Sequence, residues 1–228
     1  SASLDFARDG RVGEALVRLK GRFFIARHGE TVFNAAGRMQ GDAMDTPLTR
    51  AGFAQADAMG EGLAAFLGDG PRPGHLWASP YGRALQTLAI VCEHIGEDWH
   101  RAHKDARLAE INVGRWGGRT YADIIAEQGD IVDRSYGLFS VRPPEGEWYD
   151  EIAARLTSWL EEHGGEGGDK LVIMHGMSSR VLRGLMTGLD VDPRWKAPIA
   201  PGLPQGTMVV IEGGVERIVH MGAGKAPA

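Results

Sequence analysis

Two histidines of the chain follow short apolar segments that are typical of buried β-strands. Residues 22–26 (RFFIA) lead to Arg27 and His28, and Lys170–Met174 (KLVIM) leads directly to His175. If both segments are parallel strands of one sheet, their carboxyl ends lie at one edge, where open α/β sheets bind ligands. We therefore expect the two imidazoles to lie close together, although 147 positions separate them.

Two arginines are expected at the same edge of the sheet. Arg27 directly precedes His28, and Arg83 falls in the first turn of a helix that should follow a strand over His75–Ala78. Guanidinium groups present planar pairs of donors to phosphoryl oxygens, and helix N-termini favour anions. Together with His175 these side chains predict a phosphate site in which neither a metal ion nor another cofactor has to supply positive charge.

Such a cluster suits phosphoryl transfer. An imidazole is about half neutral near pH 6.5, so His28 is able to attack phosphorus and form a phosphohistidine. The leaving alkoxide needs a proton, and Glu110 is the expected donor, because a carboxyl group beside a phosphate dianion tends to stay protonated. Asp105 and Glu145 are rival carboxylates from the same part of the chain, and spacing alone does not choose among the three.

The elements that position these groups follow an α/β pattern, in which apolar segments of strand length alternate with helical patterns. Thr49 is expected to cap a helix whose apolar face includes Phe53, and Ser79 to cap another with Pro80 at its first position. The other predicted elements are strands over 207–211 and Val215–His220 and helices over Tyr121–Gln128, 148–160 and 179–187. This order predicts a three-layer sandwich, with a mostly parallel central sheet flanked by helices.

The length of 228 residues suits one domain with a sizeable core. We predict a single domain over residues 1–228, whose core spans about residues 22–220. The irregular segment 97–147 is expected to be an insertion that covers the active site as a lid.

The composition excludes several classes of protein. With 25 Lys and Arg against 30 Asp and Glu, the net charge is −5, so the chain lacks the positive field that nucleic-acid binding usually requires. A single cysteine, Cys92, excludes a disulfide-stapled scaffold. The longest strictly apolar runs have five residues, and residues 1–10 do not resemble a signal peptide. We therefore expect a cytoplasmic protein with no nucleic-acid or membrane partner.

Several motifs, in order, resemble the histidine phosphatase superfamily, also called the phosphoglycerate mutase-like family. They are residues 27–34 (RHGETVFN), 37–41 (GRMQG), 47–49 (PLT), 79–87 (SPYGRALQT), 108–116 (LAEINVGRW) and 175–176 (HG). The resemblance covers roughly residues 22–220, nearly the whole chain.

The resemblance implies a mixed, mostly parallel sheet with helices on both faces, and a role for each matching residue. His28 would be the phosphorylated nucleophile and Glu110 the proton donor. The residues implied to bind the transferred phosphoryl group are Arg27, Arg83, His175 and, as a further donor, Asn34. The residues implied to line the substrate pocket are Gln40, Gly41 and Gly176.

The segment after Glu110 indicates which branch of the family is expected. In phosphoglycerate mutases the proton donor is followed by Arg and Tyr, whereas Ile111 and Asn112 follow here, as in the phosphatase branch. We therefore expect a metal-independent phosphomonoesterase that acts on a small phosphorylated metabolite and releases inorganic phosphate.

Two alternatives stay open: a phosphoglycerate mutase, and a non-catalytic phospholigand-binding protein on the same fold. The identity of the substrate and the question of a homo-oligomer also stay open.

Overall fold

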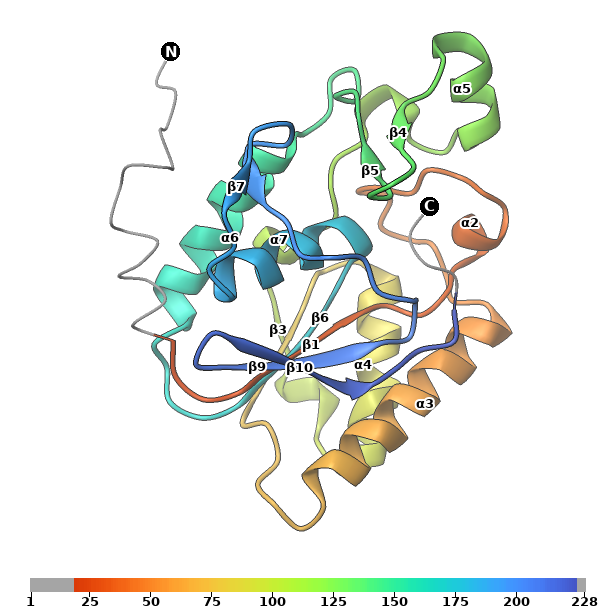
Figure 1. Ribbon diagram of the computed structural model, residues 1–228. Helices are drawn as coiled ribbons and strands as arrows, with labels where there is room; N and C mark the ends of the chain where they lie inside the picture. Colours follow the sequence, from red (N-terminus) through yellow and green to blue (C-terminus); the bar gives the residue numbers. More distant parts are fainter. Residues whose placement is uncertain (1–18, 225–228) are drawn as a thin grey trace.

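The computed structural model describes residues 19–224, which are built around a six-stranded mixed sheet (Figure 1). The strands lie in the order β10 (Val215–His220), β9 (Met208–Glu212), β1 (Phe23–Arg27), β6 (Lys170–Met174), β2 (His75–Ala78) and β3 (His103–Lys104). The strands β1, β6, β2 and β3 are parallel to one another, whereas β9 runs antiparallel to both of its neighbours, β1 and β10. The signal-peptide prediction concerns residues 1–10, which lie outside the described residues.

The register of β1 against β6 places the two histidines together. Arg27 pairs with Met174 at the end of this parallel pair, so the next residues along the two chains leave the sheet at the same edge. The pairing continues one step further, because the backbone N–H of His28 donates to the carbonyl of Met174 at 3.0 Å. The expected parallel arrangement of these two strands is confirmed.

Helices cover both faces of the sheet. Figure 1 shows α6 (Tyr149–His163) and α7 (Gly176–Met186) on one face, and α3 (Arg50–Leu67) and α4 (Gly82–Ile95) on the other. Alternate residues of β1 divide between the two cores, since Phe23 packs with α6 and α7 whereas Phe24 packs with α3 and α4. The predicted three-layer α/β sandwich is confirmed.

The observed first residues of α3 and α7 can be compared with the predicted ones. Thr49 caps α3 as expected, because its hydroxyl accepts a hydrogen bond from the N–H of Gly52 at 3.1 Å. Phe53, however, is 43% exposed and does not belong to the buried face of that helix. The helix α7 begins at Gly176, three residues earlier than predicted, so that His175 is its N-cap residue.

The predicted cap of α4 by Ser79 is wrong. The helix begins at Gly82, and Tyr81 is its N-cap residue. The N–H of Ser79 instead extends the sheet by donating to the carbonyl of Ile173 at 3.2 Å, and the N–H of Gly82 donates to the carbonyl of Met44 at 3.0 Å. The carbonyl of Met44 thus accepts from the first N–H of the helix. Arg83 still lies in the first turn, as predicted.

The segment 97–147, predicted as an insertion, carries one strand of the main sheet and several short elements. It contributes β3 to the edge of the main sheet, and it contains α5 (Tyr121–Gln128) where a helix was predicted. The N–H of Tyr121 donates to the carbonyl of Gly37 at 3.0 Å, so α5 begins against the loop that follows α2 (Val32–Ala35). The remaining short elements are η1 (Trp99–Arg101), η2 (Ala106–Leu108), η3 (Gly114–Trp116), β4 (Val132–Asp133), β5 (Leu138–Phe139), β7 (Val191–Asp192) and β8 (Ala197–Pro198).

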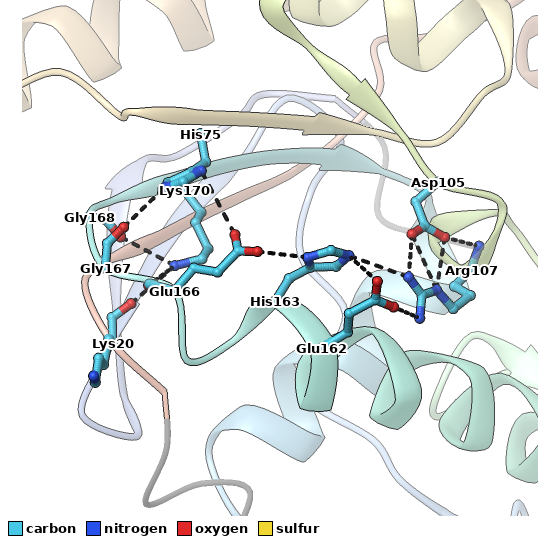
Figure 2. Close-up of polar contacts among 10 residues, drawn as sticks. All are labelled: Lys20, His75, Asp105, Arg107, Glu162, His163, Glu166, Gly167, Gly168 and Lys170. Atoms are coloured by element: carbon cyan, nitrogen blue, oxygen red, sulfur yellow. Dashed lines mark hydrogen bonds and ion pairs between the residues drawn. The ribbon is translucent and has the colours of Figure 1, made fainter.

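The amino end of β6 is held by a buried lysine. The Lys170 ammonium donates to the backbone carbonyls of Lys20, Glu166 and Gly168 at 3.3, 2.6 and 3.3 Å (Figure 2). This end of the strand lies opposite the end that leads to His175, so the network fixes the strand rather than the site. Within residues 19–224, no helix has both the length and the apolar character that crossing a membrane requires.

The loop after β1 packs so tightly on α3 that Gly52 has no room for a side chain. A Cβ atom at Gly52 would clash with the backbone oxygen of Glu30. We expect Gly52→Ala to lower the free energy of unfolding by about 1–3 kcal/mol, because the clash is with backbone. Gly74→Ala, which adds its methyl group into open space, is the matched control and should change little. Urea denaturation measures both, and equal stabilities would contradict the proposed clash.

Candidate active site

The rings of His28 and His175 face each other at the carboxyl ends of β1 and β6. Their centroids are 5.2 Å apart and their planes are inclined by 63°. The two residues are only 1% and 0% exposed. The expected meeting of the two rings is therefore observed, and it occurs in an environment that largely excludes water.

One hydrogen bond sets the tautomer of His28. Its Nδ1 lies 2.7 Å from the carbonyl oxygen of Gly29, and because a carbonyl only accepts, Nδ1 must carry the proton. The Nε2 atom of the neutral ring then carries the lone pair. Neither ring nitrogen of His175 has a hydrogen-bond partner within the described part of the chain.

Both imidazoles are held neutral in the free protein. Burial, followed by the charges of Arg83 and Arg27, lowers the pKa of His28 well below its usual 6.5. Burial, Arg83 and His28 likewise lower the pKa of His175. A neutral His28 is a nucleophile at neutral pH. His175 does not bring the positive charge that the sequence suggested, and in the free protein it is a neutral donor and acceptor.

Arg83 is buried at the site, and part of its guanidinium group already donates hydrogen bonds within the protein. Its Nη1 donates to the carbonyl of Ala43 at 2.5 Å and to the Thr46 hydroxyl at 3.0 Å, and Nη2 donates to the carbonyl of Gly41 at 2.5 Å. These bonds leave Nε and one Nη2 hydrogen for a ligand. Burial lowers the pKa of Arg83 to about 10, so the group stays charged at neutral pH.

Arg27 reaches the site across Gly176. Its buried Nε has no hydrogen-bond partner among the described residues. A Cβ atom at Gly176 would lie 3.2 Å from that Nε, so glycine allows the guanidinium to approach the start of α7. Burial lowers the pKa of Arg27, and the nearby Glu110 opposes that shift.

Glu110 is the carboxylate that the structure places beside this cluster. Its oxygens accept hydrogen bonds from the backbone N–H groups of Met177 at 3.0 Å and Ser178 at 2.9 Å, at the start of α7. The N–H of Ile111 adds a third, at 3.0 Å. All three donors are backbone N–H groups, and two of them belong to the first turn of α7. Glu110 thus shares one helix start with His175, which the predicted start at residue 179 did not foresee.

The two rival carboxylates are engaged elsewhere. Asp105 pairs with Arg107 at 2.7 Å, in a network that continues through His163 (Figure 2). Glu145 pairs with Arg115 at 2.5 Å on the surface. Of the three candidate carboxylates, Glu110 is the one that accepts hydrogen bonds at the start of α7, next to His175.

A cavity of about 290 Å³ opens beside the two histidines. Six of the predicted residues line it, namely Arg27, Asn34, Gln40, Gly41, Glu110 and Gly176. His28, Arg83 and His175 are not among the residues that line it. In residues 19–224, no group of three or more His, Cys, Asp and Glu side chains is arranged to hold a metal ion.

Hydrogen bonds within the protein orient two of the polar lining residues. The Oδ1 atom of Asn34 accepts from the backbone N–H of Thr31 at 3.1 Å, closing a capping box around α2. The Oε1 atom of Gln40 accepts from the hydroxyls of Thr31 and Thr46 at 2.8 and 3.0 Å. With these oxygens engaged, the amide N–H groups of both side chains are left for a ligand.

Two supporting residues were missed by the sequence analysis. Gln205 donates to the carbonyl of His28 at 3.0 Å. Arg155 donates to the carbonyls of Arg107 at 2.5 Å and Glu110 at 3.4 Å, holding the backbone before the proposed acid. Neither belongs to a motif, and both act on atoms distant in sequence, so no local signal marks them.

The chain belongs to the histidine phosphatase superfamily (branch 1), whose sequence pattern residues 23–223 match. It is therefore an enzyme of the phosphatase class, as the resemblance predicted. The site described above lies within the matched residues.

Two curated relatives carry different names. The chain is 36% identical over 143 residues to "6-phosphofructo-2-kinase/fructose-2,6-bisphosphatase" of Caenorhabditis elegans, a match that covers 61% of this chain and only 28% of that protein. It is 30% identical over 169 residues to "Probable phosphoglycerate mutase GpmB" of Yersinia pestis (strain Pestoides F), which covers 73% of this chain and 74% of the relative.

Solved structures share the fold. A mycobacterial glucosyl-3-phosphoglycerate phosphatase in complex with VO3 has a TM-score of 0.68 and 26% identity, over 87% of this chain and 97% of that one. An α-ribazole phosphatase from Shigella flexneri has a TM-score of 0.66 and 22% identity, over 90% and 100% of the two chains. Because the names of these proteins specify different substrates, family membership does not identify the substrate of this chain.

The buried histidines predict a pH-dependent stability. In the unfolded chain these rings take up protons near pH 6.5, whereas in the folded protein they stay neutral to a lower pH. The unfolded state then binds more protons, so stability falls as the pH decreases from about 6.5. The expected slope is at most about 1.4 kcal/mol per pH unit for each histidine.

Urea denaturation between pH 7.5 and 5.0 measures this slope. We expect His28→Asn to show a shallower loss of stability than the wild type. His100→Asn, which replaces a side chain that is 85% exposed, is the control and should leave the slope unchanged. Identical slopes for His28→Asn and the wild type would exclude the burial of a neutral His28.

Proposed function

We propose that this chain is a metal-independent phosphomonoesterase that hydrolyses a small phosphorylated metabolite through a phosphohistidine on His28. The observation that carries the proposal is the hydrogen bond from Nδ1 of His28 to the carbonyl of Gly29, at 2.7 Å. It leaves an unprotonated Nε2 on a buried, neutral ring. The centroid of this ring is 5.2 Å from that of His175, and the charged groups of Arg83 and Arg27 act on it. This combination supports nucleophilic attack without a separate base.

In the first step, Nε2 of His28 attacks phosphorus, and the bond from phosphorus to the ester oxygen breaks. Arg27 and Arg83 stabilise the charge on the equatorial oxygens, and His175 donates a further hydrogen bond. Glu110 donates a proton to the leaving oxygen. In the second step, water attacks phosphorus, Glu110 takes up its proton, and the bond to His28 breaks to release inorganic phosphate.

The remaining predicted residues complete the proposed substrate pocket. We assign hydrogen bonds with the substrate to the side chains of Asn34 and Gln40, and close backbone contact to Gly41 and Gly176. The proposed unit is the single domain of residues 1–228, with the part of 97–147 that carries α5 covering the cavity. The cytoplasmic location stays a prediction.

A phosphoglycerate mutase is the second candidate, because the Yersinia relative with that name is 30% identical over 74% of its length. A mutase returns the phosphoryl group to an acceptor hydroxyl, whereas a phosphatase transfers it to water. Phosphate release from an ester panel, measured beside the isomerisation of 3-phosphoglycerate, separates the two activities.

We expect phosphate release that persists in the presence of a metal chelator. Turnover quenched in alkali, which preserves phosphohistidine, should show one added phosphoryl group on the peptide that contains His28. His28→Asn should abolish this adduct and lower kcat by about 10³-fold or more.

His100→Asn controls for the loss of an exposed histidine and should retain the adduct. Isomerisation without net phosphate release would favour the mutase. Phosphate binding without either reaction would favour the non-catalytic alternative.

The dependence on the leaving group tests Glu110. An alkoxide needs a proton as it leaves, whereas 4-nitrophenolate does not. We expect Glu110→Gln to lower kcat about 10²–10⁴-fold for n-hexyl phosphate and much less for 4-nitrophenyl phosphate. Glu145→Gln, at the surface carboxylate paired with Arg115, should leave both rates unchanged. An equal loss on both esters in Glu110→Gln would remove Glu110 from the role of acid.

A further inference from the structure

The cavity beside the histidines is polar at the phosphoryl end and apolar over the rest of its wall. Its apolar lining consists of Met39, Ile111, Val113, Tyr121, Phe139 and Met177. Four of these six side chains are at most 2% exposed, so the wall belongs to the hydrophobic core and is poorly hydrated. A group seated there gains from leaving water in proportion to its apolar area.

The charges of the same wall are balanced. Its cations are Arg27 and Arg38, and its carboxylates are Glu30 and Glu110. Arg27 faces the phosphoryl position, and Arg38 donates to the carbonyl of Gly118 at 2.7 Å. Once a phosphoryl group has engaged Arg27, the exposed cation Arg38 is left beside Glu30 and Glu110, and Glu110 is protonated in the proposed mechanism. A second anionic group on the substrate would find little compensation for losing its hydration.

A second, more open hollow of about 370 Å³ lies on the other side of Glu110 and is acidic. Its lining carries the carboxylates of Asp42, Glu110, Glu145, Glu147 and Glu151 with the single cation Arg155. Both oxygens of Glu147 already accept hydrogen bonds from Arg155, at 2.8 and 3.1 Å. Glu145 and Glu151 pair with Arg115 and Arg142, so among the described residues this hollow has no arginine left free to bind an anionic group.

Tyr121 is a partly buried aromatic residue of this wall. Burial raises its pKa to about 12, so its hydroxyl is a neutral hydrogen-bonding group throughout the physiological range. Tyr121 is the first residue of α5. Its side chain packs against the hydrophobic core on the face of the sheet that α6 and α7 cover. It is the aromatic ring of the wall that α5 brings to the cavity.

We infer that the ester hydrolysed here has an uncharged, largely apolar leaving group that packs against this wall. Esters that carry a carboxylate or a second phosphate in the leaving group are poor substrates. The inference rests on the proposed phosphomonoesterase activity and names its substrate class. It separates this chain from the two curated relatives, whose names specify a bisphosphate and a phosphoglycerate.

The test compares two esters that both release an alkoxide, n-hexyl phosphate and 3-phosphoglycerate. Because the chemical step is similar, the ratio of their kcat/KM values reports on the leaving-group site. We expect the wild type to favour n-hexyl phosphate at least tenfold, the order expected for a few buried methylene groups.

Tyr121→Arg places a cation in the wall and should shift this ratio at least tenfold towards 3-phosphoglycerate. Val215→Arg adds the same charge at the start of β10, where the side chain is 61% exposed and outside both hollows. It is the matched control for net charge and should leave the ratio unchanged. Circular dichroism confirms that each variant is folded.

The wild-type ratio alone is decisive, so the test does not depend on the folding of Tyr121→Arg. Equal or faster turnover of 3-phosphoglycerate by the wild type would overturn the inference while leaving the proposed hydrolysis intact. A folded Tyr121→Arg with an unchanged ratio would also overturn it. Failure to release phosphate from either ester and from 4-nitrophenyl phosphate would instead overturn the proposed function, and the inference with it.

Discussion

The parallel pairing of β1 with β6 is the constraint on which the site depends. Five consecutive residue pairs hold the register, and the N–H of His28 extends it by one more hydrogen bond to Met174. A shift by one residue would turn the side chains of one strand to the opposite face of the sheet and separate the imidazoles. The strands that fix the two histidines also bury them, so the packing that brings the rings together is also what keeps them neutral.

The site concentrates polar atoms that the protein itself does not satisfy. Buried nitrogens without hydrogen-bond partners in the described residues include Nε of Arg27, Nε of Arg83 and both ring nitrogens of His175. Unpaired buried polar atoms cost free energy, so the gathering of these four at one place indicates a ligand that satisfies them together. A phosphoryl group has the three acceptor oxygens that such a cluster requires. The apolar wall nearby then separates recognition of the phosphoryl group from recognition of the leaving group.

Sequence patterns were sufficient where an element is determined by its own residues. The strands of the core and the helices α5 and α6 follow local apolar spacing, and the convergence of His28 and His175 follows from two such strands. Sequence patterns predicted the wrong first residue of a helix where a group distant in the sequence determines that start. The start of α4 depends on the carbonyl of Met44, and the start of α7 coincides with the carboxylate of Glu110. Gln205 acts through a backbone atom 177 positions away, which no local motif records.

The start of α7 holds several groups of the proposed reaction close to one another. His175 is its N-cap residue, Gly176 accommodates Arg27, and the next two N–H groups hold Glu110. A dianion arriving beside Arg27 competes with the Glu110 carboxylate for the same positive helix end. The proposed phosphoryl site and the proposed acid therefore share one helix terminus.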